Sequence, residues 1–354
     1  MYKIDSPSFF IGKGDDKLIS FGSGQPDLPP PKEVYEILPS YRDFKYGLIQ
    51  GQENLREALS KQYKGSNKDN FVITNGGSEG IDLTLRVLYK DGGKILLPRP
   101  YYYSYPFNVQ FSHMELVFYD LENGKINIEN FREQCKDIVA VIINSPSNPT
   151  GTIQDLDVLK EIERLAIENN FYIISDEVYK DLIYVRENYL MEGDTTITLN
   201  SFSKTYAMCG FRIGYVYARE QELIDKIIEM KTHTSMNTNI LGQEMAYEAT
   251  KVPQSFIDEQ AKIWQERRDF IYNGLRDSGL DLWKPEGAFY VFPKMKNPNK
   301  VVNDLYYKYN MIVYDGTWFG DPERVRFSYA LNIDKIEEGL RRLKEYLGKE
   351  YRDN

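Results

Sequence analysis

Residues 201–214 read Ser-Phe-Ser-Lys-Thr-Tyr-Ala-Met-Cys-Gly-Phe-Arg-Ile-Gly, and the rest of the chain can be interpreted around them. They follow an apolar run, Thr196–Leu199, which predicts a short buried strand. A lysine just past a strand, here Lys204, can form a Schiff base once its surroundings favour the neutral amine. Arg212, flanked by two glycines, carries a planar guanidinium that suits a phosphate group. A Schiff-base lysine beside a phosphate-binding arginine points to pyridoxal phosphate as the cofactor.

Two other interpretations of residues 201–214 were weighed. The plainer one is a surface turn with a solvated lysine and a helix-capping serine, because short motifs produce false matches. The other is a serine acyl-enzyme, since Ser201 and Lys204 fit the S-x-x-K pattern of that class. Those enzymes also need S-D-N and K-T-G tripeptides, and neither occurs in this chain. We therefore set the acyl-enzyme aside.

Length, composition and charge narrow the class of protein. The chain has 354 residues, of which 42% are hydrophobic, which is enough for a large core and two domains. Its formal net charge of −9 argues against nucleic acid or an anionic membrane as the principal partner. Two cysteines and two histidines without zinc-like spacing predict neither a disulfide framework nor a metal centre. With no signal-peptide pattern and no run of 18 apolar residues, we expect a cytoplasmic protein.

An anion site is expected where an early strand runs into a helix. Phe71–Thr74 has the pattern of a strand, residues 75–77 that of a tight turn, and a helix is expected from Ser78. The first N–H groups of a helix and the positive end of its dipole bind anions well. Gly77 and Ser78 are therefore candidates for cradling a phosphate, although a lone Gly-Gly turn is usually no more than a turn. No Gly-Lys-Ser/Thr follows, so the segment is not a P-loop.

Two later buried strands lead into polar residues. The run 138–143 is apolar almost throughout, as in parallel strands covered on both faces, and is followed by Asn148 within Asn-Pro-Thr-Gly. The run 171–174 leads to Asp176 in the same way. Open α/β sheets bind their ligands at these carboxyl ends. A carboxylate there would keep a pyridine nitrogen protonated, so that the ring can absorb electrons from a substrate carbanion; the plainer alternative for Asp176 is a helix N-cap.

Taken together, these motifs resemble the class I and II aminotransferases, a group of fold-type I pyridoxal-phosphate enzymes. The family signature reads S-x-S-K, a short spacer and G-x-R-x-G, which residues 201–214 match. Further matches lie at 21–27 (G-x-P-D), 46–56 (Y-x-x-x-x-G-x-x-x-L-R), 98–105 (P-x-P-[YF]-[WYF]-x-x-Y), 148–151 (N-P-T-G), 176–179 (D-x-x-Y) and 325–330 (a strand bearing an arginine). The matches follow the family's order and extend from about residue 20 to 347.

The resemblance implies the catalytic roles. Lys204 would hold the cofactor and move a proton between the substrate Cα and the cofactor, and Asp176 would face the pyridine nitrogen. Tyr179 and Asn148 would hydrogen-bond the cofactor's phenolate oxygen, and the tyrosine would lower the pKa of the Schiff base. For the adjacent Glu177 we expect a structural role.

The resemblance also implies binding roles. Tyr102 would stack on the pyridine ring, since aromatic faces pack well against a planar cofactor. Arg326 would pair bidentately with the substrate α-carboxylate, a task that suits arginine better than lysine. The other implied contacts are to the substrate from Gly24 and Asn148, and to the cofactor from Gly77, Ser78, Ser201, Ser203, Arg212 and Tyr46.

The architecture that the resemblance implies is an α/β fold of the fold-type I kind. A large domain would hold a mostly parallel, seven-stranded type of sheet flanked by helices, beside a smaller α/β domain. Residues 1–40 would join the small domain, 41–252 would form the cofactor-binding domain, and 253–354 would supply an interdomain helix and the rest of the small domain. In the family, the tyrosine at the position of Tyr46 reaches the cofactor phosphate of the neighbouring subunit, so we expect a homodimer.

The expected activity is that of an amino-acid aminotransferase, which works by ping-pong half-reactions with a 2-oxo acid such as 2-oxoglutarate. A decarboxylase or β-lyase on the same scaffold stays open, because enzymes resembling threonine-phosphate decarboxylases and histidinol-phosphate aminotransferases have similar lengths and cofactor residues. The aminotransferase-like domain of a transcription regulator is a weaker alternative. Those regulators carry an added basic DNA-binding domain, for which this acidic chain has no room.

The amino donor is the least determined part of this prediction. Many prokaryotic aspartate aminotransferases carry a lysine at the position of Ser78, close to the substrate's side-chain carboxylate, and serine cannot supply that charge. The sequence does not show which residue could supply a second cation. Because residues 101–103 and Trp318 place aromatic rings near the expected site loops, we expect a broad or aromatic-leaning donor, with aspartate second.

Overall fold

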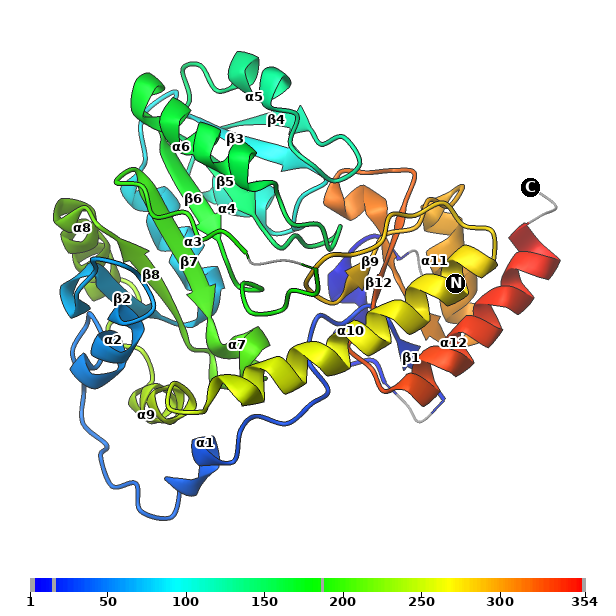
Figure 1. Ribbon diagram of the computed structural model, residues 1–354, viewed down its shortest axis with the longest axis horizontal. Coiled ribbons are helices and arrows are strands. Elements are labelled where there is room, and N and C mark those ends of the chain that lie inside the picture. Colours follow the sequence, from blue (N-terminus) through cyan, green and yellow to red (C-terminus); the bar gives the residue numbers. More distant parts are fainter. Residues whose placement is uncertain (1–3, 15–16, 186–187, 352–354) are drawn as a thin grey trace.

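A seven-stranded sheet forms the centre of the computed structural model, which describes residues 4–14, 17–185 and 188–351 (Figure 1). The strand order is β2-β8-β7-β6-β5-β3-β4, and β8 alone runs antiparallel to its neighbours. Its strands are β2 (Phe71–Thr74), β3 (Lys94–Arg99), β4 (Glu115–Asp120), β5 (Ala140–Asn144), β6 (Tyr172–Asp176), β7 (Thr196–Ser201) and β8 (Gly214–Ala218). This confirms the predicted mostly parallel sheet.

Helices cover both faces of this sheet because its strands carry apolar side chains on both faces. In β3, Ile95 and Leu97 pack in one core with α3, α4 and α8, whereas Leu96 points into a second core with α5 and α6. A third core joins the β2–β8 edge to α2 and α9. These helices are α2 (Glu53–Ser60), α3 (Gly76–Val87), α4 (Tyr105–Phe111), α5 (Ile128–Gln134), α6 (Leu156–Asn169), α8 (Gln221–Thr232) and α9 (Ile240–Ala249).

Helix α3 differs from its predicted bounds in a way that matters for the site. It begins at Gly76, two residues before the expected start at Ser78. Gly76 has a φ of +75°, a conformation that glycine adopts without steric cost, so the chain turns from β2 into the helix without a separate loop. The glycine pair therefore belongs to the first turn of the helix, where backbone N–H groups lack intrahelical partners.

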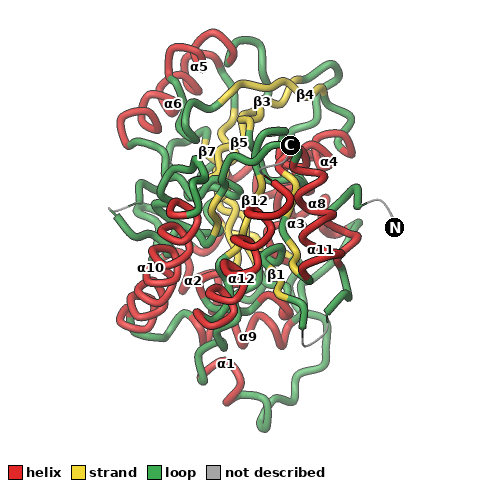
Figure 2. The backbone as a smooth tube through the Cα atoms, turned by 90° about the vertical axis from the view of Figure 1, so that its right-hand side faces the viewer, coloured by secondary structure: helices red, strands yellow, loops and turns green. Residues whose placement is uncertain are grey.

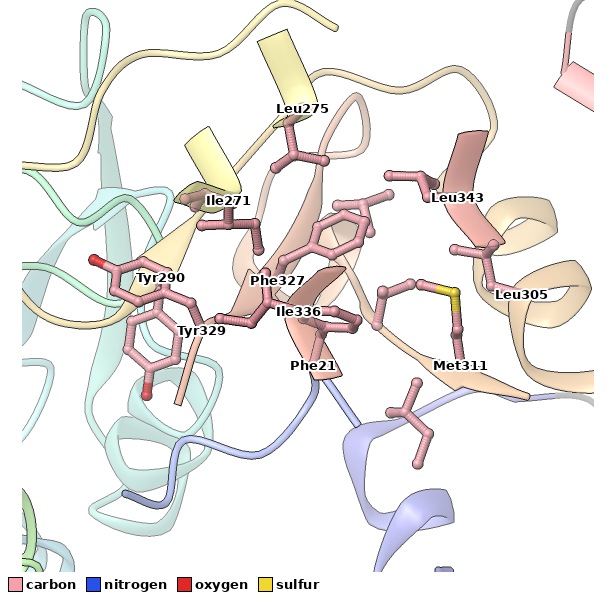
Figure 3. Packing of buried hydrophobic residues seen from close by; sticks show 14 of the residues in the cluster. Phe21, Ile271, Leu275, Tyr290, Leu305, Met311, Phe327, Tyr329, Ile336 and Leu343 are labelled. Atoms are coloured by element: carbon pink, nitrogen blue, oxygen red, sulfur yellow. The ribbon is translucent and has the colours of Figure 1, made fainter. Parts of the chain in front are cut away.

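The second part of the molecule holds two small sheets. The N-terminal strand β1 (Ile19–Ser20) pairs in parallel with β10 (Met311–Ile312), and the second sheet has the order β11-β12-β9. Its core gathers the aromatic and aliphatic side chains labelled in Figure 3, including Phe21, Ile271, Phe327 and Ile336. The other elements of this part are β9 (Tyr290–Val291), β11 (Tyr314–Asp315), β12 (Val325–Ser328), α10 (Gln254–Asp277), α11 (Pro298–Tyr309) and α12 (Ile333–Tyr346).

Helix α10 links the two parts, running from beside α9 to the small sheets (Figure 1). In the view of Figure 2, α12 lies between α10 and α11, and it packs against both. Strand β1 pairs with β10 of the second part and α10 begins at Gln254, whereas Val34 packs in the core that joins the β2–β8 edge to α2 and α9. The division at residues 40 and 252 stays a proposal. No helix in the described ranges is both long and apolar enough to cross a membrane.

Candidate active site

A cleft of about 690 Å³ opens at the carboxyl ends of β5, β6 and β7, on the side that faces the small sheets. Segments distant in the sequence meet there: the N-terminal stretch, the first turn of α3, the loop before α4, the ends of three strands, and β12. Every predicted site residue except Tyr46 lines this cleft, namely Gly24, Gly77, Ser78, Tyr102, Asn148, Asp176, Tyr179, Ser201, Ser203, Lys204, Arg212 and Arg326.

Lys204 lies in the short helix α7 (Phe202–Thr205), which begins directly after β7. Ser201 caps this helix by accepting a hydrogen bond from the Ser203 N–H, with 3.4 Å between Oγ and N. The Lys204 Nζ donates to the carbonyl oxygen of Gly24 at 2.6 Å, so the glycine backbone of the N-terminal segment lies at the reactive amine. Burial lowers the pKa of Lys204, and the positive charges of Arg326 and Arg212 lower it further, against the opposing effects of Cys209 and Asp176. Both effects favour the neutral, nucleophilic amine.

Donors for an anion gather at one end of the cleft. Arg212 has a φ of +57° and holds its guanidinium against the first turn of α3, where a Cβ added to Gly76 would lie 2.6 Å from Nη2. The side chain of Asn75, the N-cap of α3, accepts no hydrogen bond from that turn, and its amide nitrogen donates to the Glu79 carboxylate. The N–H groups of Gly77 and Ser78 and the guanidinium therefore face one space, as a phosphate site requires.

Asp176, at the end of β6, is the carboxylate of the cleft. Its side chain accepts hydrogen bonds from the Tyr105 hydroxyl at 2.5 Å and from the Val178 N–H at 3.2 Å. Asn144 fixes the backbone at this point by donating to the Asp176 carbonyl oxygen at 3.0 Å. Burial raises the pKa of Asp176, while the two hydrogen bonds and the charge of Lys204 lower it. A cation placed against this carboxylate would offset the cost of burying it.

Arg326 lies across the cleft on β12 and is 2% exposed. Its Nη1 donates to Asn148 Oδ1 at 2.9 Å, and its Nη2 donates to the Gly22 carbonyl oxygen. The guanidinium is stacked between aromatic rings, at 4.5 Å from the centroid of Tyr290 and 4.6 Å from that of Tyr314. Its buried Nε has no hydrogen-bond partner among the described residues. An orphaned donor on a buried arginine is costly and indicates a place for an anionic ligand.

Tyrosines form one wall of the cleft. The hydroxyl oxygens of Tyr179 and Tyr290 lie 2.8 Å apart, and the centroids of the two rings lie 5.7 Å apart. Burial is the main cause that raises the pKa of both phenols, for Tyr290 to about 12, so both are neutral hydroxyls near pH 7. Burial also raises the pKa of Tyr102, whose ring lies 5.4 Å from Tyr105.

Several cleft residues were not assigned roles from the sequence. Tyr105 stands last in the aromatic motif at 98–105, and Asn144 precedes the Asn-Pro-Thr-Gly turn. Cys209 lies within the matched segment 201–214, where no spacing rule singles it out, and Tyr290 lies outside the matched motifs. Lys13 gave no sequence signal.

Three aromatic residues that were named from the sequence do not line the cleft. Tyr46 is 84% exposed and does not line the cleft. Tyr101 stacks on Phe118, with ring centroids 5.5 Å apart, and Trp318 packs edge-on against Tyr314 at 5.5 Å. Of the aromatic residues 101–103, Tyr102 and Tyr103 line the cleft.

Comparisons with known proteins agree with this geometry. The family model "Aminotransferase class I and II" matches residues 16–343. A probable aspartate aminotransferase of Methanocaldococcus jannaschii is 34% identical over 92% of each chain. An aromatic-amino-acid aminotransferase of Thermococcus litoralis is 30% identical over 96% of this chain and 94% of its own length. The solved aspartate aminotransferase of Thermotoga maritima, 29% identical, superposes with a TM-score of 0.91 over 97% of this chain and 95% of its own. The chain therefore belongs to the class I and II aminotransferases, enzymes of the fold-type I group.

Proposed function

We propose that this aminotransferase binds pyridoxal 5′-phosphate in the cleft and transfers the α-amino group of an amino acid to a 2-oxo acid such as 2-oxoglutarate, by ping-pong half-reactions. The observation that carries the proposal is the partly buried amine of Lys204, whose pKa is lowered, between the donors around Arg212 and the buried Arg326. Such an amine can attack a carbonyl carbon at neutral pH.

The described residues fit this cofactor. Its phosphate would be held by the N–H groups of Gly77 and Ser78, the hydroxyls of Ser201 and Ser203, and the guanidinium of Arg212, a set in which every group can donate and none is a carboxylate. Asp176, buried and raised in pKa, would meet the protonated ring nitrogen, whose charge would favour the ionised carboxylate. When bound, pyridoxal phosphate supplies an electrophilic carbon for the amino group and a ring that withdraws electrons from the substrate Cα.

The chain's own residues would perform the remaining tasks. Arg326 would orient the substrate by its α-carboxylate, and its unpaired Nε offers a further donor there. Lys204, displaced by the incoming amine, would carry the proton from Cα, because its lowered pKa suits a general base near neutral pH. Tyr179 and Asn148 would donate hydrogen bonds to the cofactor's phenolate oxygen, and Tyr102 would cover the ring.

The amino donor is proposed to be broad or aromatic-leaning, with aspartate second. Tyr102, Tyr103, Tyr290 and Tyr314 line the cleft and offer faces for an aromatic side chain. Both aspartate and aromatic-amino-acid aminotransferases are among the relatives. These relatives do not favour the decarboxylase or β-lyase alternative.

A half-reaction screen tests this function. The aldehyde form of the holoenzyme would be mixed with each common amino acid, histidinol phosphate and threonine phosphate, and its absorbance followed through one turnover. We expect conversion to the amine form with phenylalanine or tyrosine at least as fast as with aspartate. Much faster conversion by aspartate would refute the aromatic preference. Carbon dioxide released from threonine phosphate, without conversion to the amine form, would overturn the aminotransferase assignment for this substrate.

We also propose that the active unit is a homodimer in which Tyr46 completes the neighbouring cofactor site. Phe44, Tyr46 and Leu48 form a run of apolar side chains that are 83%, 84% and 58% exposed. Large apolar side chains exposed together are typical of a surface that a partner covers. Tyr46 lies outside its own cleft, which is the placement expected of a residue that serves another subunit's site.

Subunit mixing tests this proposal. Tyr46→Phe is expected to be impaired and Lys204→Ala inactive, but a heterodimer of the two has one site with both native residues. Random re-association in equal amounts should recover about a quarter of native sites, since half of the dimers are mixed and each has one intact site. Mass-verified heterodimers with no recovered activity would contradict the shared site.

A further inference from the structure

The cleft is lined by one more basic side chain than the proposed function requires. Among the described residues that line it, four have basic side chains, Lys13, Lys204, Arg212 and Arg326, and one is a carboxylate, Asp176. Lys204 is assigned to the reaction, Arg212 to the cofactor phosphate and Arg326 to the α-carboxylate. Lys13 has no assigned task.

The position of Lys13 is fixed by packing that leads back to Arg326. The short turn η1 (Pro7–Phe10) precedes it, and the Lys13 N–H donates to the Phe10 carbonyl oxygen at 3.1 Å. Phe10 is 7% exposed and stacks on Tyr314 at 5.9 Å. Tyr314 in turn lies 4.6 Å from the guanidinium of Arg326. Lys13 therefore lies on the side of the cleft that would bind the substrate's carboxylate.

The amine of Lys13 is available to a ligand. The residue is exposed, and its Nζ lies 4.2 Å from the ring centroid of Phe9. Within the described parts of the chain, no carboxylate forms an ion pair with it. An ammonium on a flexible four-carbon stem acts as a point charge that can reach anions at different depths.

We propose that Lys13 binds a second anionic group at the far end of the substrate, a carboxylate or a phosphate, and so determines specificity for acidic substrates. The inference rests on the proposed function, because it assumes that Arg326 holds the α-carboxylate. Lys13 would supply the second cation, for the distal anionic group, that Ser78 cannot supply. It also explains how one cleft serves an aromatic donor and 2-oxoglutarate, since Lys13 can turn toward a distal carboxylate or out to solvent beside an aromatic ring.

The test compares Lys13→Gln with Lys32→Gln, a matched variant of an exposed lysine on the same N-terminal segment but outside the cleft. Rates of the half-reaction, as kcat/KM, would be measured for aspartate, glutamate, phenylalanine and alanine. We expect Lys13→Gln to lower kcat/KM about tenfold for the two acidic substrates through a higher KM. Losing a hydrogen bond to a charged group weakens binding by about this factor. In Lys13→Gln, kcat/KM for phenylalanine and alanine should stay unchanged. Lys32→Gln should have the native kcat/KM for all four substrates, and Lys13→Arg should restore kcat/KM for the two acidic ones. Threonine phosphate and histidinol phosphate, run beside the acidic amino acids, distinguish a phosphate from a carboxylate as the preferred anion.

A binding measurement separates failure of this inference from failure of the proposed function. Calorimetric titration of the holoenzyme with glutarate and with butyrate needs no turnover. Native enzyme should bind glutarate more tightly than butyrate, and Lys13→Gln should remove that difference at low salt, where exposed charges are least screened. The inference is wrong if Lys13→Gln retains the full preference for the dicarboxylate. It is also wrong if the variant lowers kcat/KM equally for acidic and apolar substrates. If native enzyme converts no amino acid but shows the Lys13-dependent preference, the proposed function fails and the anion site stands.

Discussion

Replacing Lys204 by alanine is expected to reduce turnover by on the order of 10⁴-fold, because on the proposed function one residue would supply both the cofactor link and the proton transfer at Cα. The loss should fall on kcat, since Arg326 and Asn148 would still bind the substrate. Steady-state and single-turnover rates measure this, with the variant saturated with cofactor. The remaining cofactor contacts at Gly77, Ser78 and Arg212 should hold the cofactor without a covalent bond.

A conservative variant separates chemistry from charge at this position. Lys204→Arg keeps the positive charge and can still donate to the Gly24 carbonyl oxygen. Its guanidinium cannot form the covalent link and stays protonated, so we expect it to be as inactive as Lys204→Ala. Activity of Lys204→Arg within tenfold of the native enzyme would show that the residue acts through its charge alone.

Replacing Asp176 by alanine or asparagine is expected to lower kcat by about 10²–10³-fold, the usual effect of losing one preorganised electrostatic contact at a reacting group. The phosphate contacts do not involve this side chain, so cofactor affinity should fall much less than the rate. Asparagine keeps the size of the side chain and removes its charge. The two variants should therefore be similarly slow if charge is the cause, as measured in half-reactions with a saturating amino donor.

The adjacent carboxylate provides the control. Glu177 is 2% exposed and does not line the cleft, and it accepts a hydrogen bond from the Ser175 hydroxyl at 3.0 Å. Burial raises its pKa to about 8, so it is largely neutral at pH 7 and an amide is a close substitute. Glu177→Gln should therefore react at nearly the native rate. Equal losses in the Asp176 and Glu177 variants would assign both effects to folding.

The sequence predicted which residues lie together in the cleft, because most of them follow strands of one sheet. Parallel strands place their carboxyl ends along one edge, so Asn148, Asp176 and Lys204 had to lie near one another once the apolar runs before them were identified as strands. The motif order supplied the rest. Tyr46 is exposed, so its role depends on a second subunit and stays a prediction.

Contacts between distant segments could not be predicted in this way. In α10, the charged residues Arg267 and Arg268 are buried beside the apolar Ile271. Arg267 pairs with Asp27 at 2.5 Å, and Arg268 donates to the Pro285 carbonyl oxygen. Buried arginines need such partners, and no local sequence pattern predicts a partner 240 residues away. The position of Lys13 could not be predicted for the same reason, since its place beside the cleft depends on Phe10 packing against Tyr314.

Peptide mapping after borohydride reduction tests the central assignment most directly. The holoenzyme would be reduced, digested and analysed by mass spectrometry, with Lys204→Ala treated in parallel. We expect the cofactor mass on the peptide that contains Lys204, and no labelled peptide from the variant. The other informative lysine is Lys231, which is 0% exposed and paired with Glu79 at 2.9 Å near the first turn of α3. Cofactor found on Lys231, or on any lysine other than Lys204, would contradict the assignment.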